Sequence, residues 1–156
     1  MGSLEPGEGA GRPGSGFRIR PFESSDEAAI VHLWRVCGLV VPQNDPHRDI
    51  ARKARVNPVM FLVGLQFGEI VGSCMAGYEG HRGWINYLAV APDHRRSGLA
   101  TKLMDEATRL LRKAGCPKIN LQVRSSNDEV IAFYRHLGYE FDEVVSLGLR
   151  LEPDES

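Results

Sequence analysis

WINYLAVAPDHRRSGLATKLMDEATRLLRKAG, residues 84–115, is the stretch that decides the fold. Its first part, Trp84–Val90, is rich in aromatic and β-branched side chains and predicts a strand. Pro92 ends this strand, because proline cannot donate to a sheet ladder. A helix is then expected from about Ser97 or Gly98 to Gly115, since apolar residues recur at helical spacing. This apolar face comprises Leu99, Leu103, Met104, Ala107, Leu110 and Leu111.

The joint between strand and helix predicts an anion site. The first amides of a helix lack intrahelical partners, and the helix dipole places partial positive charge there. Gly98 has no Cβ, so a ligand can approach the main chain, and Ala100 is almost as small. Arg95 and Arg96 add two cations. The pattern indicates a phosphate or pyrophosphate held mainly by backbone, against the alternative of an ordinary turn with surface arginines.

Two motifs carry a resemblance to a known family. R-x-x-G-x-A at 95–100, after a strand ending L-A-V-A-P, resembles the acetyl-coenzyme A signature of the GNAT superfamily of N-acetyltransferases. N-x-x-V-x-x-F-Y-x-x-L-G-Y at 127–139 resembles the later motif of the same superfamily. The resemblance covers residues 17–151 and is closest to the YpeA-like branch, through residues 77–83 and 115–119.

Length and composition bound the class of protein. The chain has 156 residues, a hydrophobic fraction of 42% and a formal net charge of −1, which predict one domain with its own core. Balanced charge disfavours nucleic acid and anionic membranes as partners. We expect a disordered leader over 1–16, a single N-acetyltransferase domain over 17–151 and an acidic, frayed tail over 152–156.

The three cysteines predict neither a disulfide framework nor a metal site. Cys37, Cys74 and Cys116 are odd in number and irregularly spaced, which is typical of a reducing compartment. No C-x-x-C pair occurs, so no metal is expected. Without an apolar run long enough to span a bilayer, the sequence predicts a cytoplasmic protein.

The other expected elements complete an α/β fold. We predict a mixed sheet in a three-layer α/β/α sandwich, because strands flank helix crossovers. A capping box of Ser24 and Glu27 opens one helix, and Asp45 with Pro46 opens a second, whose basic residues form a solvated face. The remaining elements are strands over 17–20, 60–66, 70–78, 118–123, 139–145 and 146–151, and a helix over 127–137.

The resemblance implies more than the spacing does. It implies that the two central strands splay apart beyond a bulge, in the acyl-CoA N-acyltransferase fold, and that the pantetheine arm of acetyl-CoA, the co-substrate, pairs with main-chain groups near Leu88 and Val90. Asn127 heads the last helix as an N-cap, and the family also places it on the cofactor arm. The implied cofactor-binding residues are Leu88, Ala89, Val90, Arg95, Arg96, Ser97, Gly98, Leu99, Ala100, Thr101, Asn127 and Tyr134.

The resemblance also implies direct acetyl transfer to a primary amine of a small molecule or protein, in a ternary complex. A backbone N–H near Leu88 would stabilise the developing oxyanion. Tyr134 stands where the family keeps the general acid that protonates the leaving thiolate, and its alternative role is that of a core tyrosine.

The proton acceptor for the incoming amine is left open. A related branch has glutamate in an L-E-V-R pattern, where this chain has the neutral Gln122. The candidate substitutes are Glu79, His81 or a chain of water, which Asn86 and Tyr87 could orient. The alternative hypothesis that Gln122 raises is an acetyl-CoA-binding sensor without transferase activity. The acceptor pocket is expected from loops 36–44, 78–83 and 142–146, with a homodimer as one way to complete it.

Overall fold

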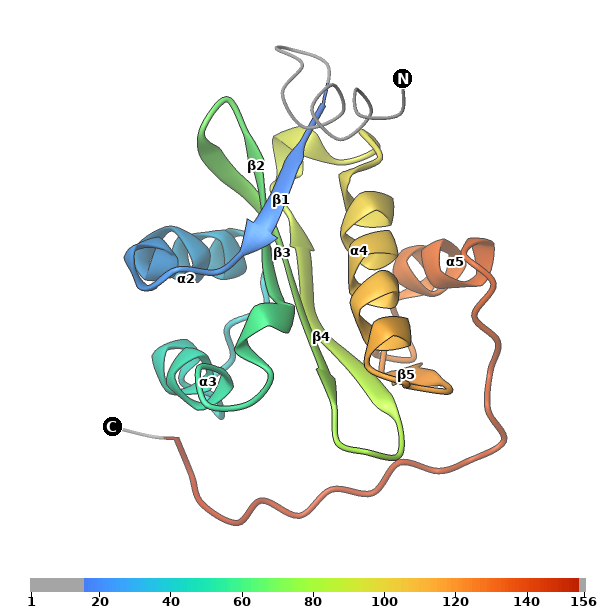
Figure 1. Ribbon diagram of the computed structural model, residues 1–156. Coiled ribbons are helices and arrows are strands. Elements are labelled where there is room, and N and C mark those ends of the chain that lie inside the picture. Colours follow the sequence, from blue (N-terminus) through green and yellow to red (C-terminus); the bar gives the residue numbers. More distant parts are fainter. Residues whose placement is uncertain (1–15, 155–156) are drawn as a thin grey trace.

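A computed structural model describes residues 16–154, in which five strands form one mixed sheet (Figure 1). The order is β1-β2-β3-β4-β5, and neighbours are antiparallel except β4 and β5, which are parallel. All but the last residue of the expected leader lies outside the described part, as do residues 155–156. The strands are β1 (Arg18–Pro21), β2 (Phe61–Gln66), β3 (Glu69–Tyr78), β4 (Gly83–Val90) and β5 (Ile119–Leu121).

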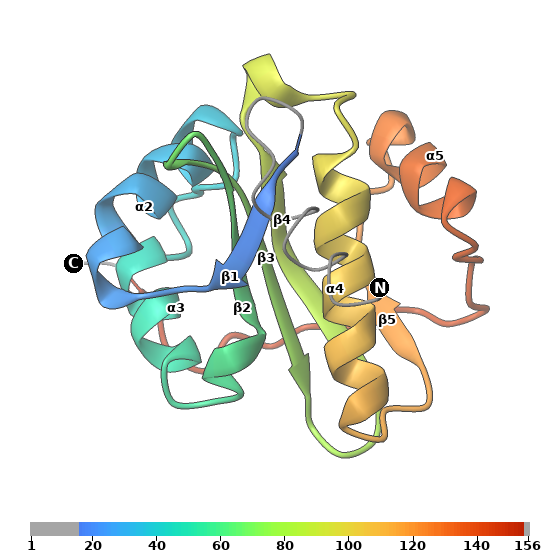
Figure 2. The same ribbon diagram turned by 45° about the horizontal axis from the view of Figure 1, so that its top comes forward.

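Helices cover both faces of this sheet, so the predicted three-layer sandwich is confirmed. α2 (Glu27–Val36) and α3 (Pro46–Lys53) lie on one face, and α4 (Leu99–Lys113) and α5 (Asp128–His136) lie on the other (Figures 1 and 2). α4 begins immediately after Gly98, as its apolar spacing predicts. None of the helices within 16–154 has the length and apolar character needed to cross a bilayer.

Each face of the sheet has its own apolar core. On the α4 side, Leu99 and Leu103 are fully buried together with Cys74. On the α2 side, the core is built around Trp34, whose Nε1 donates to Ser73 Oγ at 2.9 Å. Apolar residues of the loop that follows α2 also pack against this second core. This loop therefore contributes to the packing of the domain.

Of the two helix starts predicted with caps, one differs in detail from the sequence prediction. The capping box before α2 is formed by Glu23 and Asp26, and the prediction of Ser24 with Glu27 was wrong by one residue. The buried carboxylate of Asp26 also accepts hydrogen bonds from Nη1 and Nη2 of Arg20, at 2.8 and 3.0 Å, and these bonds hold it in the capping position. The Asp45 cap of α3 is confirmed, since its side chain accepts from the His47 amide at 2.9 Å.

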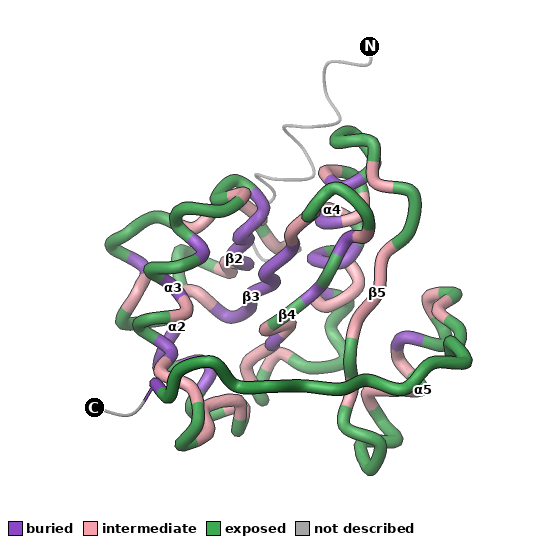
Figure 3. Tube along the Cα trace, turned by 90° about the horizontal axis from the view of Figure 1, so that it is seen from below, coloured by how far each residue is buried: buried purple, intermediate pink, exposed green. Residues whose placement is uncertain are grey.

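The predicted closing strands over 139–145 and 146–151 are wrong. Residues 140–154, the C-terminal arm, run extended along the outside of the domain from α5 to α3 (Figures 1 and 3), and residues 140–151 form no backbone hydrogen bond to any described residue. The arm is held at its far end, where Asp154 binds Arg52 at 2.7 and 3.0 Å and accepts from the Asp45 amide. Asp154 is therefore tied to α3, whereas the start of the arm stays beside β5, where Asp142 bonds to Lys118 and Asn120.

Candidate active site

The two central strands separate where the site is expected. β4 and β5 pair only from Gly83 to Ile85, and beyond that point no described strand pairs with β4 on the side away from β3. Between two pairs with β3, Ser73 with Ala89 and Met75 with Asn86, β4 has one residue more than its partner. Tyr87 takes a left-handed φ of 53° at this bulge. The splay and the bulge that the resemblance implies are thus both present, and they leave the main chain of β4 open at Leu88.

The turn into α4 presents unpaired amides. No described residue accepts a hydrogen bond from the backbone N–H of residues 96–101. Gly98 has a φ of 90°, and a Cβ built on it would meet no atom within 4 Å, so the space above the main chain is open. α4 is 15 residues long, which gives these amides a helix dipole behind them. The arrangement fits a diphosphate.

Side chains at this turn and on the end of β4 divide into two groups. Leu99 is fully buried and Ala89 nearly so, which leaves only their main-chain groups for a ligand. Arg95 and Arg96 are exposed; the Arg95 Nε donates to the Val90 carbonyl at 3.2 Å, and Arg96 lies 3.9 Å from Glu129. Both guanidinium groups can move towards an anion, because neither is held by a buried partner.

Tyr134 reaches into the core from α5. It is 7% exposed, and its ring meets those of Phe133 and Tyr139 edge-on at 5.1 and 5.4 Å. Burial raises the pKa of its phenol, and the nearby Cys74 thiol adds to the rise. Cys74 lies on β3 opposite the β4 bulge. Tyr134 and Cys74 thus belong to the same apolar core, on the α4 side of the sheet.

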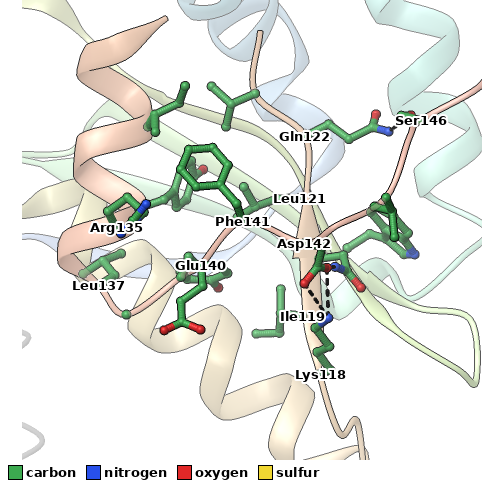
Figure 4. Close-up of a pocket in the computed structure, with 18 of the residues that line it drawn as sticks. Lys118, Ile119, Leu121, Gln122, Arg135, Leu137, Glu140, Phe141, Asp142 and Ser146 are labelled. Atoms are coloured by element: carbon green, nitrogen blue, oxygen red, sulfur yellow. Dashed lines mark hydrogen bonds and ion pairs between the residues drawn. The ribbon is translucent and has the colours of Figure 1, made fainter. Parts of the chain in front are cut away.

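A hollow of about 1370 Å³ lies along β5 (Figure 4). Among the expected catalytic and cofactor-binding residues, only Tyr134 lines it. Of the three loops expected to form the acceptor pocket, 142–146 lines the hollow and 36–44 and 78–83 do not. Asp142 binds Lys118 at 2.9 Å and Asn120 at 2.8 Å across it, and Gln122 bonds to Ser146.

The comparisons with known proteins agree with this geometry. The model of the acetyltransferase (GNAT) family matches residues 27–139. The chain belongs to the GNAT family of acetyltransferases. Acetyl-CoA is the acetyl donor of this family, and the open amides before α4 lie within the matched region.

Relatives of this GNAT chain match almost their whole length. An acetyltransferase of Sodalis glossinidius is 48% identical over 140 residues, 89% of this chain and 99% of the relative. One of Pectobacterium atrosepticum is 48% identical over 138 residues, with 88% and 98% covered. The crystal structure of Ard1 from Thermoplasma volcanium matches with a TM-score of 0.71 at 28% identity, over 81% of this chain and 84% of that one. The protein is thus an enzyme of the acetyltransferase class.

Glu79 and His81 lie in the hairpin that precedes β4. Leu88 is five residues beyond Gly83 along β4, roughly 16 Å at the usual rise of a strand. Glu79 accepts from the amides of His81 and Arg82 at 2.6 and 2.5 Å, and these bonds lower the pKa of its carboxyl. The structure therefore does not bring either side chain to Tyr134 or Leu88, and neither lines the hollow.

The helix cap at Asn127 is confirmed, since its Oδ1 accepts from the Val130 amide at 3.2 Å. Tyr87 has a role that sequence reasoning missed. Its ring stacks on Trp34 at 3.7 Å, and its hydroxyl donates to Asp49 at 2.7 Å. No motif signals this bond, because it joins β4 to α3 across 38 residues of sequence. Tyr87 thereby ties the bulge to the α3 layer.

Proposed function

We propose that this GNAT enzyme transfers an acetyl group from acetyl-CoA directly to a primary amine of a small molecule or a protein. The observation that carries the proposal is the row of unpaired amides at residues 96–101, which opens beside the gap between β4 and β5. The diphosphate of the co-substrate would lie on these amides, with Arg95 and Arg96 beside it. The thioester end would then reach Leu88 and Tyr134.

The residues of the chain supply two of the three chemical tasks. The Leu88 amide would donate to the carbonyl oxygen as negative charge develops on it. As the amine nitrogen bonds to the carbonyl carbon and the carbon–sulfur bond breaks, the Tyr134 hydroxyl would give its proton to the sulfur. The burial that raises the pKa of Tyr134 also disfavours a thiolate, as the Cys74 thiol illustrates, whose pKa burial raises to about 12. Burial would likewise make a leaving thiolate in this gap a stronger base than it is in water.

Water is the proposed acceptor of the proton that the amine loses. Gln122 is neutral, and its amide is bonded to Ser146. Glu79 is exposed, its carboxyl pKa is lowered, and it lies in the hairpin before β4. Only the unprotonated fraction of the amine would then react. The rate should therefore rise with pH up to the pKa of the amine that accepts the acetyl group.

Two matched glycine variants test the anion site. Gly98 and Gly115 stand at opposite ends of α4, with φ of 90° and 88°, and a Cβ at either position meets open space. Gly98→Leu and Gly115→Leu should therefore lose similar stability, about 1–2 kcal/mol. Only Gly98→Leu should lose acetyl-CoA binding by titration calorimetry, because its side chain covers the open amides. Equal affinity in the two variants would remove the anion site from residues 96–101.

A thiol-release assay then tests transfer itself. Acetyl-CoA is supplied with polyamines, amino acids, aminoglycosides and N-terminal peptides in turn, and free coenzyme A is measured. Release that depends on one class of amine supports transferase activity and names the acceptor. Tight acetyl-CoA binding without release for any amine would favour the sensor hypothesis.

A further inference from the structure

Ser73 is a fully buried polar residue of β3, and its hydroxyl joins two partners. Trp34 Nε1 donates to Ser73 Oγ at 2.9 Å, and Ser73 Oγ donates to the Tyr87 carbonyl at 2.8 Å. An indole N–H can only donate, so the bond from Trp34 takes a lone pair of Oγ and leaves the hydroxyl proton for Tyr87. The direction of this chain of hydrogen bonds, from α2 through β3 to β4, is therefore fixed.

The chain of hydrogen bonds ends on the peptide group that joins Tyr87 to Leu88. This group is planar and trans, so its C=O and its N–H point in opposite directions. The carbonyl faces Ser73 on β3, and the N–H of Leu88 consequently faces away from β3. On that side β4 pairs with β5 only as far as Ile85, so the N–H faces the open gap.

Tyr87 would not hold this orientation by itself. Its φ of 53° lies in the left-handed region, which costs free energy for a residue with a Cβ and persists only where the surroundings enforce it. The ring of Tyr87 stacks on that of Trp34, with 3.7 Å between the ring centroids, and Trp34 is fully buried. Trp34 thus holds the side chain of Tyr87 directly and its carbonyl through Ser73. Without the hydroxyl of Ser73, the ring would remain stacked but the peptide group would be free to turn.

We propose that Ser73 is a positioning residue, which aims the Leu88 N–H at the thioester carbonyl oxygen of acetyl-CoA. This role rests on the proposed function, in which that N–H stabilises the oxyanion. The hydrogen bond that Ser73 receives from Trp34 strengthens the one that it gives, because hydrogen bonds in a chain polarise one another. The bond to the Tyr87 carbonyl in turn polarises the peptide group and makes the Leu88 N–H a stronger donor. Ser73 itself is fully buried, so it acts only through this peptide group.

The C=O stretch of bound acetyl-CoA measures this hydrogen bond directly, with or without an amine acceptor. In infrared difference spectra with acetyl-CoA isotopically labelled at the thioester carbonyl, the wild type should lower the stretching frequency relative to free acetyl-CoA. In Ser73→Ala the frequency should return towards the free value. The dissociation constant of acetyl-CoA should stay close to that of the wild type, because the open amides of residues 96–101 are intact in the variant.

Val63→Ala is the matched control. Val63 is fully buried and lies opposite Ser73 in the pairing of β2 with β3, so the substitution loosens the same core without removing either hydrogen bond. It should keep the lowered stretching frequency and the wild-type kcat. With an amine that serves as acceptor, kcat of Ser73→Ala should fall about 10-fold or more, and KM for acetyl-CoA should stay close to the wild-type value.

Several results would overturn the role of Ser73. An unchanged stretching frequency in Ser73→Ala would do so, as would an equal change in Val63→Ala, or a wild type that does not lower the frequency. Amine-dependent release of coenzyme A would in each case still support the proposed function. Conversely, a lowered frequency that Ser73→Ala abolishes, without transfer to any amine, would uphold the role of Ser73 and reject the transferase activity. If circular dichroism shows that Ser73→Ala does not fold, Ser73→Cys takes its place, because a thiol fills the same space and is only a weak donor.

Discussion

Gly72 of β3 and Leu99 of α4 share one space: a Cβ on Gly72 would lie 2.8 Å from Cδ2 of Leu99. Gly64 of β2 makes the same allowance, since its Cβ would lie 2.9 Å from Cδ1 of Leu99. The absence of two side chains on the sheet therefore lets the first residue of α4 sit directly on it. This contact sets the position of the start of α4, and with it the open amides of residues 96–101, relative to the sheet.

Gly72→Ala should lower both stability and cofactor affinity. The added methyl group also meets Leu103 at 3.1 Å and the Ala89 carbonyl at 3.2 Å, and the latter is backbone that cannot rotate away. We expect a loss of about 1–3 kcal/mol in the free energy of unfolding, typical of overpacking. Acetyl-CoA should bind more weakly because the start of α4 is displaced. Urea denaturation and calorimetric titration measure the two effects.

Gly148→Ala is the matched control for this substitution, since a Cβ at Gly148 meets no atom within 4 Å. It should leave both stability and acetyl-CoA affinity close to the wild type. If Gly72→Ala also behaves like the wild type in both measurements, the contact with Leu99 does not position α4.

Tyr134→Phe should slow turnover and spare binding. Loss of a general acid typically lowers kcat by about 100-fold or more, whereas the ring keeps its packing against Phe133 and Tyr139. Because burial raises the pKa of this phenol, it stays protonated through neutral and mildly alkaline pH. The wild-type rate should therefore show no falling limb from Tyr134 below about pH 10. Steady-state kinetics across pH measure both expectations.

Tyr139→Phe serves as the control for Tyr134, because it removes a second hydroxyl from the same aromatic group. It should retain the wild-type kcat. A Tyr134→Phe variant with full turnover would show that Tyr134 is a core tyrosine and that another group, or water, protonates the thiolate.

The local period of the sequence was sufficient to predict the central strand β4 and the helix α4 that follows it. Trp84–Gly115 alternates as a strand and then repeats as a helix, and β4 and α4 follow that pattern within two residues. The bulge at Tyr87 has no such local signal, because it depends on the pairing of β4 with β3. The family resemblance supplied the bulge and the splay, and spacing did not.

The arm shows where local pattern is insufficient. Residues 145–151 alternate as clearly as any strand of the sheet, yet a strand needs an edge to pair with. The ion pair of Asp154 with Arg52, separated by 102 residues, instead draws the arm to α3. Propensity within a segment carries no information on such a distant anchor.

Lys53 is a second case, because a basic residue on a short surface helix was expected to be solvated. α3 buries Pro46, Ile50 and Lys53, which recur at helical spacing and form its inner face. Lys53 is 8% exposed, and its ammonium donates to the Ala76 carbonyl. The helical spacing alone therefore places Lys53 on the buried face of α3. The prediction was wrong because it relied on the charge of the side chain.

Burial of Lys53 should contribute to the free energy of unfolding a part that rises with pH. Desolvation lowers the pKa of Lys53 in the folded state to about 8, from 10.5 in the unfolded chain. Between these values the unfolded state holds the proton and the folded state does not, so the free energy of unfolding increases as pH rises from about 8 to 10.5. From about pH 7 to pH 9 the gain should be about 1.4 kcal/mol.

Lys53→Met isolates this effect, because methionine keeps the aliphatic stem and has no proton to lose. As pH rises through that interval, the free energy of unfolding of the wild type should increase relative to that of Lys53→Met. The Cys74 thiol contributes in the opposite direction only above its unfolded pKa of 9.0, since burial raises its folded pKa to about 12. Urea denaturation of both proteins at several pH values measures the difference. Parallel curves for wild type and Lys53→Met would mean that the ammonium of Lys53 is solvated in the folded protein.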